Sequence, residues 1–169
     1  MADKVEFAEV FRAEHRAIRD ALLGLIQAFR KSDPAQMREF LGRVAALAGP
    51  HFRYEEEALY PALTAVLDEE QVGELVRAHD SAIEAARELK ALAARAELGQ
   101  EEAERGARLA RNLLPHVFEC DGLSIMAELL PEQAIETVLK VRAGSLGDNL
   151  DLLRWADTVR PRSSANALN

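Results

Sequence analysis

The sequence predicts an all-α protein: an up-down-up-down four-helix bundle with one or two short extra helices at its C-terminal end. The 169-residue chain is rich in Ala, Leu and charged helix formers and has only 9 Gly and 6 Pro, which favours helix throughout. Its apolar residues recur with a helical period over four long segments. The connections between these segments are short, so segments that follow one another should run antiparallel.

The four long segments are expected at about residues 4–30, 34–67, 68–99 and 100–130. Ser32-Asp33-Pro34 separates the first two and is a helix N-cap candidate with proline at the first helical position. Gly49-Pro50 interrupts the second segment, and Pro115 lies inside the fourth. Prolines at these places predict local kinks in two helices.

The helical pattern continues beyond Pro131 as one or two shorter helices, at about 132–143 and 146–159. We expect these to pack on the bundle or on a partner. No change in composition marks a second domain, so one domain is predicted over residues 1–159, with its core at about 4–130. Residues 160–169 are expected to form a flexible tail.

Composition and charge exclude several classes of function. The net charge of −8 gives no electrostatic reason to bind nucleic acid or an anionic membrane surface. No apolar run approaches the roughly 20 residues that span a bilayer, and the N-terminal residues have a helical pattern, unlike a signal peptide. Cys120 is the only cysteine, so no internal disulfide can form. These features predict a cytoplasmic monomer or homodimer.

The chain has four histidines, and one falls on each predicted long helix. His15 and His51 are separated by nearly the same interval as His79 and His116, and in each half the second histidine directly follows a proline. This duplicated spacing indicates a repeated helix pair. Histidines at one depth of such a bundle converge in its core, which is how helical bundles build metal sites.

His51 and Glu55 form the clearest single motif. Residues four apart lie on one helical face, so this imidazole and this carboxylate can reach one metal ion together. Imidazole and carboxylate ligands suit iron, manganese or zinc, and a carboxylate can bridge two metal ions.

Residues 51–63, HFRYEEEALYPAL, closely resemble the H-F-x-x-E-E-x-x-L-Y/F-P-x-L signature of the hemerythrin-like HHE cation-binding family. The E-H-x-x-I sequence that begins at Glu14 and the placement of His79 resemble this family too, so the resemblance covers about residues 7–130. It implies a four-helix bundle with two irons joined by an oxo or hydroxo bridge, with zinc or manganese as alternatives. The metal ligands that it implies are His15, His51, Glu55, His79 and His116.

The fourth helix departs from the family pattern, because Cys120 stands where a second bridging glutamate belongs. Asp121 and Glu119 are the preferred replacements, five and three positions after His116. Cys120 itself is the third candidate, as a thiolate, although a lone cysteine is often simply a small buried apolar residue.

Two further residues are expected just outside the metal ligands. Glu56 follows the motif glutamate, and Tyr60 should pack nearby with its hydroxyl bonded to a carboxylate such as Glu56 or Glu57. Ligation by the Tyr60 phenolate is the alternative.

The resemblance implies a protein that binds, senses or reacts with oxygen, nitric oxide or peroxide at a non-haem metal site. Oxygen-carrying hemerythrins have two histidines four apart on the third helix. The positions four before and four after His79 are Leu75 and Ile83, which are not ligands, and this argues against a dedicated oxygen carrier. The alternatives are iron delivery or metal-centre repair, and a redox enzyme that consumes peroxide or nitric oxide. A last alternative is a purely structural bundle that binds no metal, and the complete set of four histidines argues against it. A binding role is favoured over an enzymatic one.

Overall fold

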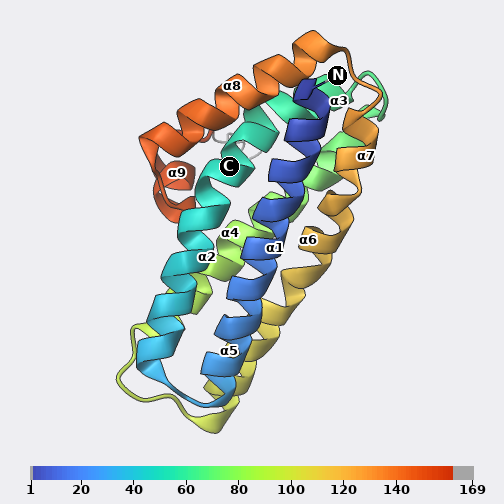
Figure 1. The fold of residues 1–169 in the computed structure, drawn as a ribbon. Coiled ribbons are helices and arrows are strands. Elements are labelled where there is room, and N and C mark those ends of the chain that lie inside the picture. Colours follow the sequence, from blue (N-terminus) through green and yellow to red (C-terminus); the bar gives the residue numbers. More distant parts are fainter. Residues whose placement is uncertain (1, 162–169) are drawn as a thin grey trace, which may run out of the picture.

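The computed structural model describes residues 2–161, apart from the side chains of Ala2 and Asp121, and within this range it contains helices and no strand (Figure 1). The prediction of an all-α protein is therefore confirmed. The elements in chain order are α1 (Ala2–Arg30), α2 (Pro34–Tyr54), the π-helix η1 (Glu55–Leu59), α3 (Tyr60–Leu63), α4 (Glu69–Ala93), α5 (Gln100–Asn112), α6 (Leu114–Asp121), α7 (Leu123–Ala127), α8 (Glu132–Asp148) and α9 (Leu152–Thr158). Most of the predicted tail, residues 162–169, lies outside the described residues.

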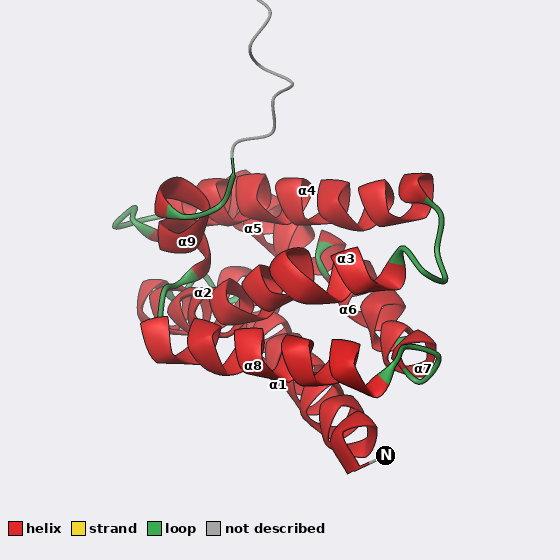
Figure 2. Ribbon diagram, turned by 90° about the horizontal axis from the view of Figure 1, so that it is seen from above, coloured by secondary structure: helices red, strands yellow, loops and turns green. Residues whose placement is uncertain are grey.

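Long helices run side by side as rods, and α8 and α9 lie across them (Figures 1 and 2). The rods are α1, α2 with its continuation through η1 and α3, α4, and the series α5–α6–α7. Helix α1 packs against α2, α5 and α6, and α4 packs against α2 and α5. Helix α8 crosses α1, α2 and η1, whereas α9 lies on α2 and α4. Within residues 2–161 every helix is too short or too polar to span a bilayer.

Side-chain caps explain where two of the rods begin. The Asp33 carboxylate accepts hydrogen bonds from the backbone N–H groups of Ala35 and Gln36, with Pro34 at the first helical position, as the sequence predicts. Asp68 and Gln71 form a reciprocal capping box at the start of α4. These caps satisfy backbone donors that have no partner within the helix.

The two histidine-preceding prolines have different effects on the backbone. Pro50 lies inside α2, which continues through it to Tyr54, whereas Pro115 lies in the first turn of α6 after a break at Leu113. A proline in a first turn loses no helical hydrogen bond, because that N–H has no partner there anyway. The interruption predicted at Gly49-Pro50 in the second segment is therefore wrong, and the fourth segment instead breaks at Leu113, just before Pro115.

The predicted break at about residues 143–146 is also wrong. Helix α8 runs to Asp148 and ends at Asn149, which adopts the left-handed conformation with φ 50°. The Asp151 carboxylate then caps α9 by accepting the backbone N–H of Arg154. A glycine inside a helix costs only about 1 kcal/mol relative to alanine, so Gly144 and Gly147 can stay helical while α8 packs on the rods.

The hydrophobic core has an aromatic end and an aliphatic end, and the histidines lie between them. Phe7, Phe11, Tyr54 and Tyr60 belong to one buried cluster, together with leucines of η1 and α3. Leucines of α1 and α4 form another cluster with Phe29. Polar groups placed between these clusters are therefore shielded from water by apolar side chains on both sides.

Gly49 permits close contact between α2 and the segment that leads into α9. A methyl group at this position would collide with the backbone of Leu150 and Asp151. We expect Gly49→Ala to lower the free energy of unfolding by about 1–3 kcal/mol, measured by urea denaturation. Gly42 lies in the same helix with open space around it, so Gly42→Ala should instead stabilise the protein by about 0.5–1 kcal/mol. Equal effects of the two substitutions would contradict this account.

Candidate metal site

The four histidines come from four different rods and meet in the interior as two pairs. His15 of α1 and His51 of α2 have ring centroids 4.5 Å apart, and His79 of α4 and His116 of α6 have centroids 4.9 Å apart. His15, His51 and His79 are buried, and His116 is partly buried. The structure thus brings together all four histidines that the sequence singles out.

Glu55 lies between the two histidine pairs. Its Oε1 is 3.4 Å from His51 Nε2, and its Oε2 is 3.1 Å from His79 Nε2. The side chain is fully buried, yet among the described residues neither oxygen accepts a hydrogen bond of acceptable geometry. A buried carboxylate without well-aligned donors is costly unless charged partners compensate for its lost hydration. Both oxygens are therefore available to cations.

A π-helical turn supplies Glu55 to the site. Helix α2 changes to the π-helix η1 at Glu55, and the N–H of Tyr60 bonds back to the Glu55 carbonyl. Pro61 lies directly after this bond, where its ring would clash with the carbonyl of Glu57 in a regular α-helix. We attribute the wider turn to this clash, and such π-turns often occur at functional sites.

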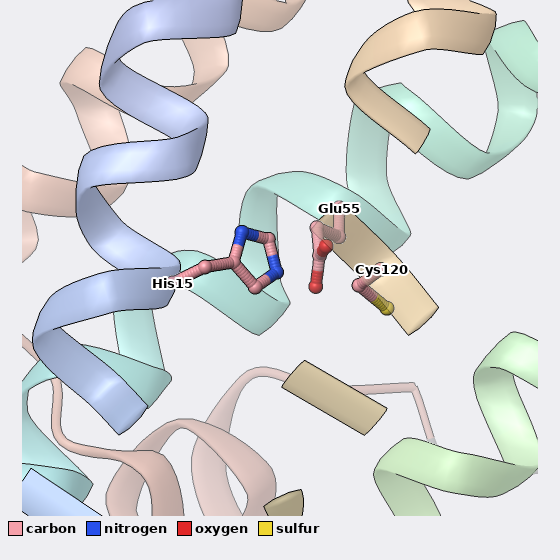
Figure 3. Close-up of side chains that lie close together, drawn as sticks. All are labelled: His15, Glu55 and Cys120. Atoms are coloured by element: carbon pink, nitrogen blue, oxygen red, sulfur yellow. The ribbon is translucent and has the colours of Figure 1, made fainter. Parts of the chain in front are cut away.

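Two groups of candidate ligands share Glu55. One comprises His15, Glu55 and Cys120, and the other comprises Glu55, His79 and His116, with the ligand atoms of each group within 4.8 Å of one another. Figure 3 shows the first group, whose side chains gather from α1, η1 and α6. The shared carboxylate can therefore serve two neighbouring cation positions.

Of the three fourth-helix candidates, Cys120 is the one that belongs to a candidate ligand group among the described residues. Cys120 is fully buried, and its Sγ lies 3.4 Å from His116 Nδ1. Glu119 is exposed and lies outside both ligand groups, and the side chain of Asp121 lies outside the described part of the chain. A residue four positions on is nearly in line with His116 on the helix, whereas one three positions on is turned further away. The orientation of α6 therefore turns Cys120 towards the site.

Burial and neighbouring charges shift the pKa values of the cluster in opposite directions. Burial disfavours the charged form of His51, but Glu55 and Glu14 outweigh this and raise the pKa of His51 to about 9. Burial also disfavours the charged form of Glu55, yet His51 and His79 outweigh this and hold the pKa of Glu55 well below its usual range. Without a metal ion, the carboxylate is thus neutralised by imidazolium partners. A cation that binds here must replace protons.

His116 and Cys120 behave differently because both tend to stay neutral. Burial and the neighbouring charge of His79 lower the pKa of His116 to about 4. Burial and the charge of Glu55 raise the pKa of the Cys120 thiol. His116 therefore offers a neutral imidazole to a cation, whereas Cys120 would have to lose its proton to bind as a thiolate.

Hydrogen bonds on the Nδ1 side of His51 hold its ring and extend to α8. Its Nδ1–H donates to Glu14 Oε2 over 2.8 Å, and the Tyr54 hydroxyl donates to the same oxygen over 2.7 Å. Arg142 of α8 donates from Nε to the other oxygen, Glu14 Oε1, over 2.7 Å. The Nε2 atom of His51 consequently faces His15 and Glu55.

His79 has a corresponding network that reaches the end of α9. Its Nδ1–H donates to Glu56 Oε1 over 2.8 Å, and Arg160 donates to both Glu56 oxygens, each over 2.9 Å. Arg160 also pairs with Asp80 Oδ1 at 2.6 Å. This residue was expected to begin the flexible tail, but the structure fixes it against the site.

Tyr60 lies closer to the histidines than predicted. Its hydroxyl oxygen is 3.0 Å from His79 Nε2, so the expected bond to Glu56 or Glu57 is wrong. The widened π-turn lies just before Tyr60 and rotates its side chain towards the cluster. Burial raises the pKa of this hydroxyl well above its usual value, which keeps it protonated.

Sequence reasoning missed Glu14, Tyr54 and both arginines as parts of the site. Glu14 could have been suspected, because it precedes His15 in the E-H sequence on which the family resemblance rests. Tyr54 lies within the motif region. The two arginines carry no local signal, because they reach the site from helices far along the chain.

The fold and the site define a class: an all-helical protein that gathers buried imidazole, carboxylate and thiol groups of the kind that bind metal cations. The family model for the hemerythrin HHE cation binding domain matches residues 6–123. The chain belongs to this family, whose description implies cation binding, and the expectation from the sequence resemblance is confirmed. Comparison with curated proteins and with solved structures finds no match.

Proposed function

We propose that this protein binds two iron ions on either side of Glu55, and there binds, senses or reacts with oxygen, nitric oxide or peroxide. The proposal includes the predicted topology, in which the four rods that carry the ligands run up-down-up-down. The observation that carries it is the Glu55 carboxylate, which is fully buried between two histidine pairs with no well-aligned hydrogen bond to either oxygen among the described residues.

The donor set fits such a metal pair. His15, His51 and Cys120 would bind on one side of Glu55, and His79 and His116 on the other. Imidazole and carboxylate donors suit iron, manganese and zinc, and a single thiolate is compatible with each of the borderline metals. Bound iron supplies redox change and Lewis acidity, and the protein side chains supply its position and a dry environment.

A small apolar cavity next to the histidines favours the proposal of a small ligand. It has a volume of about 30 Å³, and His15, His51 and His116 are among its lining residues. The remaining lining is mainly aliphatic, from residues such as Leu22 and Leu89. A space of this size admits molecules of a few atoms, such as the diatomic gases and peroxide, and not a larger organic substrate.

Redox turnover of peroxide or nitric oxide is the second candidate, and the position of Tyr60 favours it. Its hydroxyl lies 3.0 Å from His79 Nε2, inside the cluster, and remains protonated because it is buried. A neutral hydroxyl at this place can donate a hydrogen bond or a proton to a small ligand. In simple binding the same hydroxyl would only orient the ligand.

The test is metal analysis followed by reaction of the reduced protein. After anaerobic reconstitution with iron(II), we expect two irons per chain, because two ligand groups share Glu55. The reduced protein is then mixed with oxygen, nitric oxide or peroxide and followed by absorption spectroscopy. A stable, reversible adduct supports binding, and rapid repeated consumption of peroxide or nitric oxide supports turnover. A chain that takes up no metal after reconstitution contradicts both.

A further inference from the structure

The two arginines that reach the site come from outside the matched family domain. The match ends at residue 123, whereas Arg142 lies on α8 and Arg160 follows α9. Each completes a series of contacts that runs from an arginine through a glutamate to a histidine. Arg142 holds Glu14, whose other oxygen accepts from His51, and Arg160 holds Glu56, which accepts from His79.

We propose that Arg142 and Arg160 are positioning residues, through which the C-terminal helices hold one histidine on each side of Glu55 ready to bind metal. This inference rests on the proposed metal site. It assigns a role to the segment after the family domain: that segment sets the metal affinity of the site as well as covering the bundle.

The geometry gives the reason. A histidine that donates its Nδ1–H to a carboxylate has Nε2 left for a metal ion, and the ring orientation is fixed. In both series Nδ1 is bound to the glutamate, and Nε2 faces Glu55, at 3.4 Å for His51 and 3.1 Å for His79. The two histidines therefore already present the correct nitrogen to the shared carboxylate.

The arginines hold the carboxylates in the orientation that this requires. Glu14 and Glu56 are mostly buried, with 18% and 13% of their side chains exposed, so both need charged partners. Arg160 contacts both oxygens of Glu56 in the planar two-bond arrangement that guanidinium groups favour. Without these arginines the glutamates could rotate towards solvent, and the histidines would lose their fixed orientation.

His15 shows that this support is selective. Its Nδ1–H donates to the carbonyl of Phe11 within α1, so its orientation comes from its own helix. The C-terminal arginines thus act on His51 and His79, whose Nε2 atoms lie 3.4 Å and 3.1 Å from the Glu55 oxygens. We therefore expect both cation positions to depend on the docking of α8 and α9.

The experiment compares metal affinity in five variants of the full chain, four with arginine changed to glutamine and one with Arg160 changed to lysine. Zinc affinity is measured by competition with a chromogenic chelator for Arg142→Gln and Arg160→Gln, and we expect about 10- to 100-fold weaker binding in each. The matched controls are Arg53→Gln and Arg87→Gln, which remove ion pairs to Asp148 at the end of α8 and to Asp157 in α9. These pairs hold the same two helices without touching Glu14 or Glu56, so the controls should bind zinc within about twofold of wild type.

A spectroscopic readout separates positioning from a loss of folding. In the diamagnetic zinc form, ¹⁵N NMR should show His51 and His79 with a hydrogen-bonded Nδ1–H and a metal-bound Nε2. Arg142→Gln should alter the His51 signals and leave those of His79, and Arg160→Gln should do the reverse. Arg160→Lys, which keeps the charge without the two-bond geometry, should bind zinc with intermediate affinity.

Three outcomes overturn the inference: arginine variants that bind zinc as tightly as wild type, controls that weaken binding equally, or histidine signals that do not change selectively. Failure of the proposed metal site is recognised separately, because the wild-type protein would then bind no zinc at all.

Discussion

Glu55→Gln is expected to abolish metal binding at both positions. The Glu55 carboxylate belongs to both ligand groups, and its oxygens face His51 and His79 separately. Glutamine keeps the shape of the side chain, but it loses the charge and turns one oxygen into an amide donor that faces an imidazole nitrogen. Because loss of an outer partner alone costs about 10- to 100-fold in affinity, loss of a shared ligand should cost more than about 100-fold.

The measurement is iron per chain after reconstitution, together with the circular dichroism of the metal-free variant to verify folding. Glu57→Gln is the matched control, because Glu57 lies in the same π-turn but points to Arg53 at the surface. The control should retain two irons. A folded Glu55→Gln protein that also retains two irons would refute the shared carboxylate.

Cys120→Ser should remove a sulfur ligand from one metal position and leave the other filled. Cobalt(II) reports this change directly, because a thiolate ligand produces an intense charge-transfer absorption that oxygen and nitrogen ligands do not. We expect this band in wild-type protein and its loss in Cys120→Ser. One cobalt ion should bind at least about 10-fold more weakly, since loss of an outer partner alone costs about 10- to 100-fold. The expectation follows from the fully buried Cys120 side chain, whose sulfur lies within 4.8 Å of ligand atoms of His15 and Glu55.

Three further variants locate the fourth-helix ligand. Cys120→Glu supplies the carboxylate that the repeat places opposite Glu55, so it should hold two cobalt ions without the sulfur band. Glu119→Gln should behave as wild type because Glu119 is exposed. Asp121→Asn tests the alternative from the sequence. If Asp121→Asn loses a metal ion while Cys120→Ser keeps both, the assignment of Cys120 is wrong.

The helical rods could be predicted from the sequence because their signals are local. Apolar residues at helical spacing located the rods, and Asp33-Pro34 marked the start of α2 correctly. The break within the C-terminal segment was misplaced, because helix propensity at Gly144 and Gly147 is a weak signal that tertiary packing overrides. Asn149, which actually ends α8 in the left-handed conformation, is a residue type that tolerates this conformation, so the local signal lay at Asn149 and not at Gly144.

The histidines and Glu55 could likewise be found from spacing alone, whereas the fourth-helix side chain that joins their cluster could not. Position 119 and position 120 both lie on the broad face of His116, and the choice between them depends on how α6 is rotated after its break at Leu113. The direction of Tyr60 depends on the π-turn before it.

The contacts of Arg142 and Arg160 depend on the docking of α8 and α9, which no local pattern encodes. Sequence periodicity therefore predicts which residues enter the core, but the tertiary packing decides which of them meet.

Diffraction from crystals of the iron-loaded protein, recorded at the iron absorption edge, tests the central claim most directly. Two anomalous peaks should appear on opposite sides of the Glu55 carboxylate, one near His15, His51 and Cys120 and the other near His79 and His116. A single peak that does not contact Glu55, or iron bound only at surface carboxylates, would contradict the shared two-cation site.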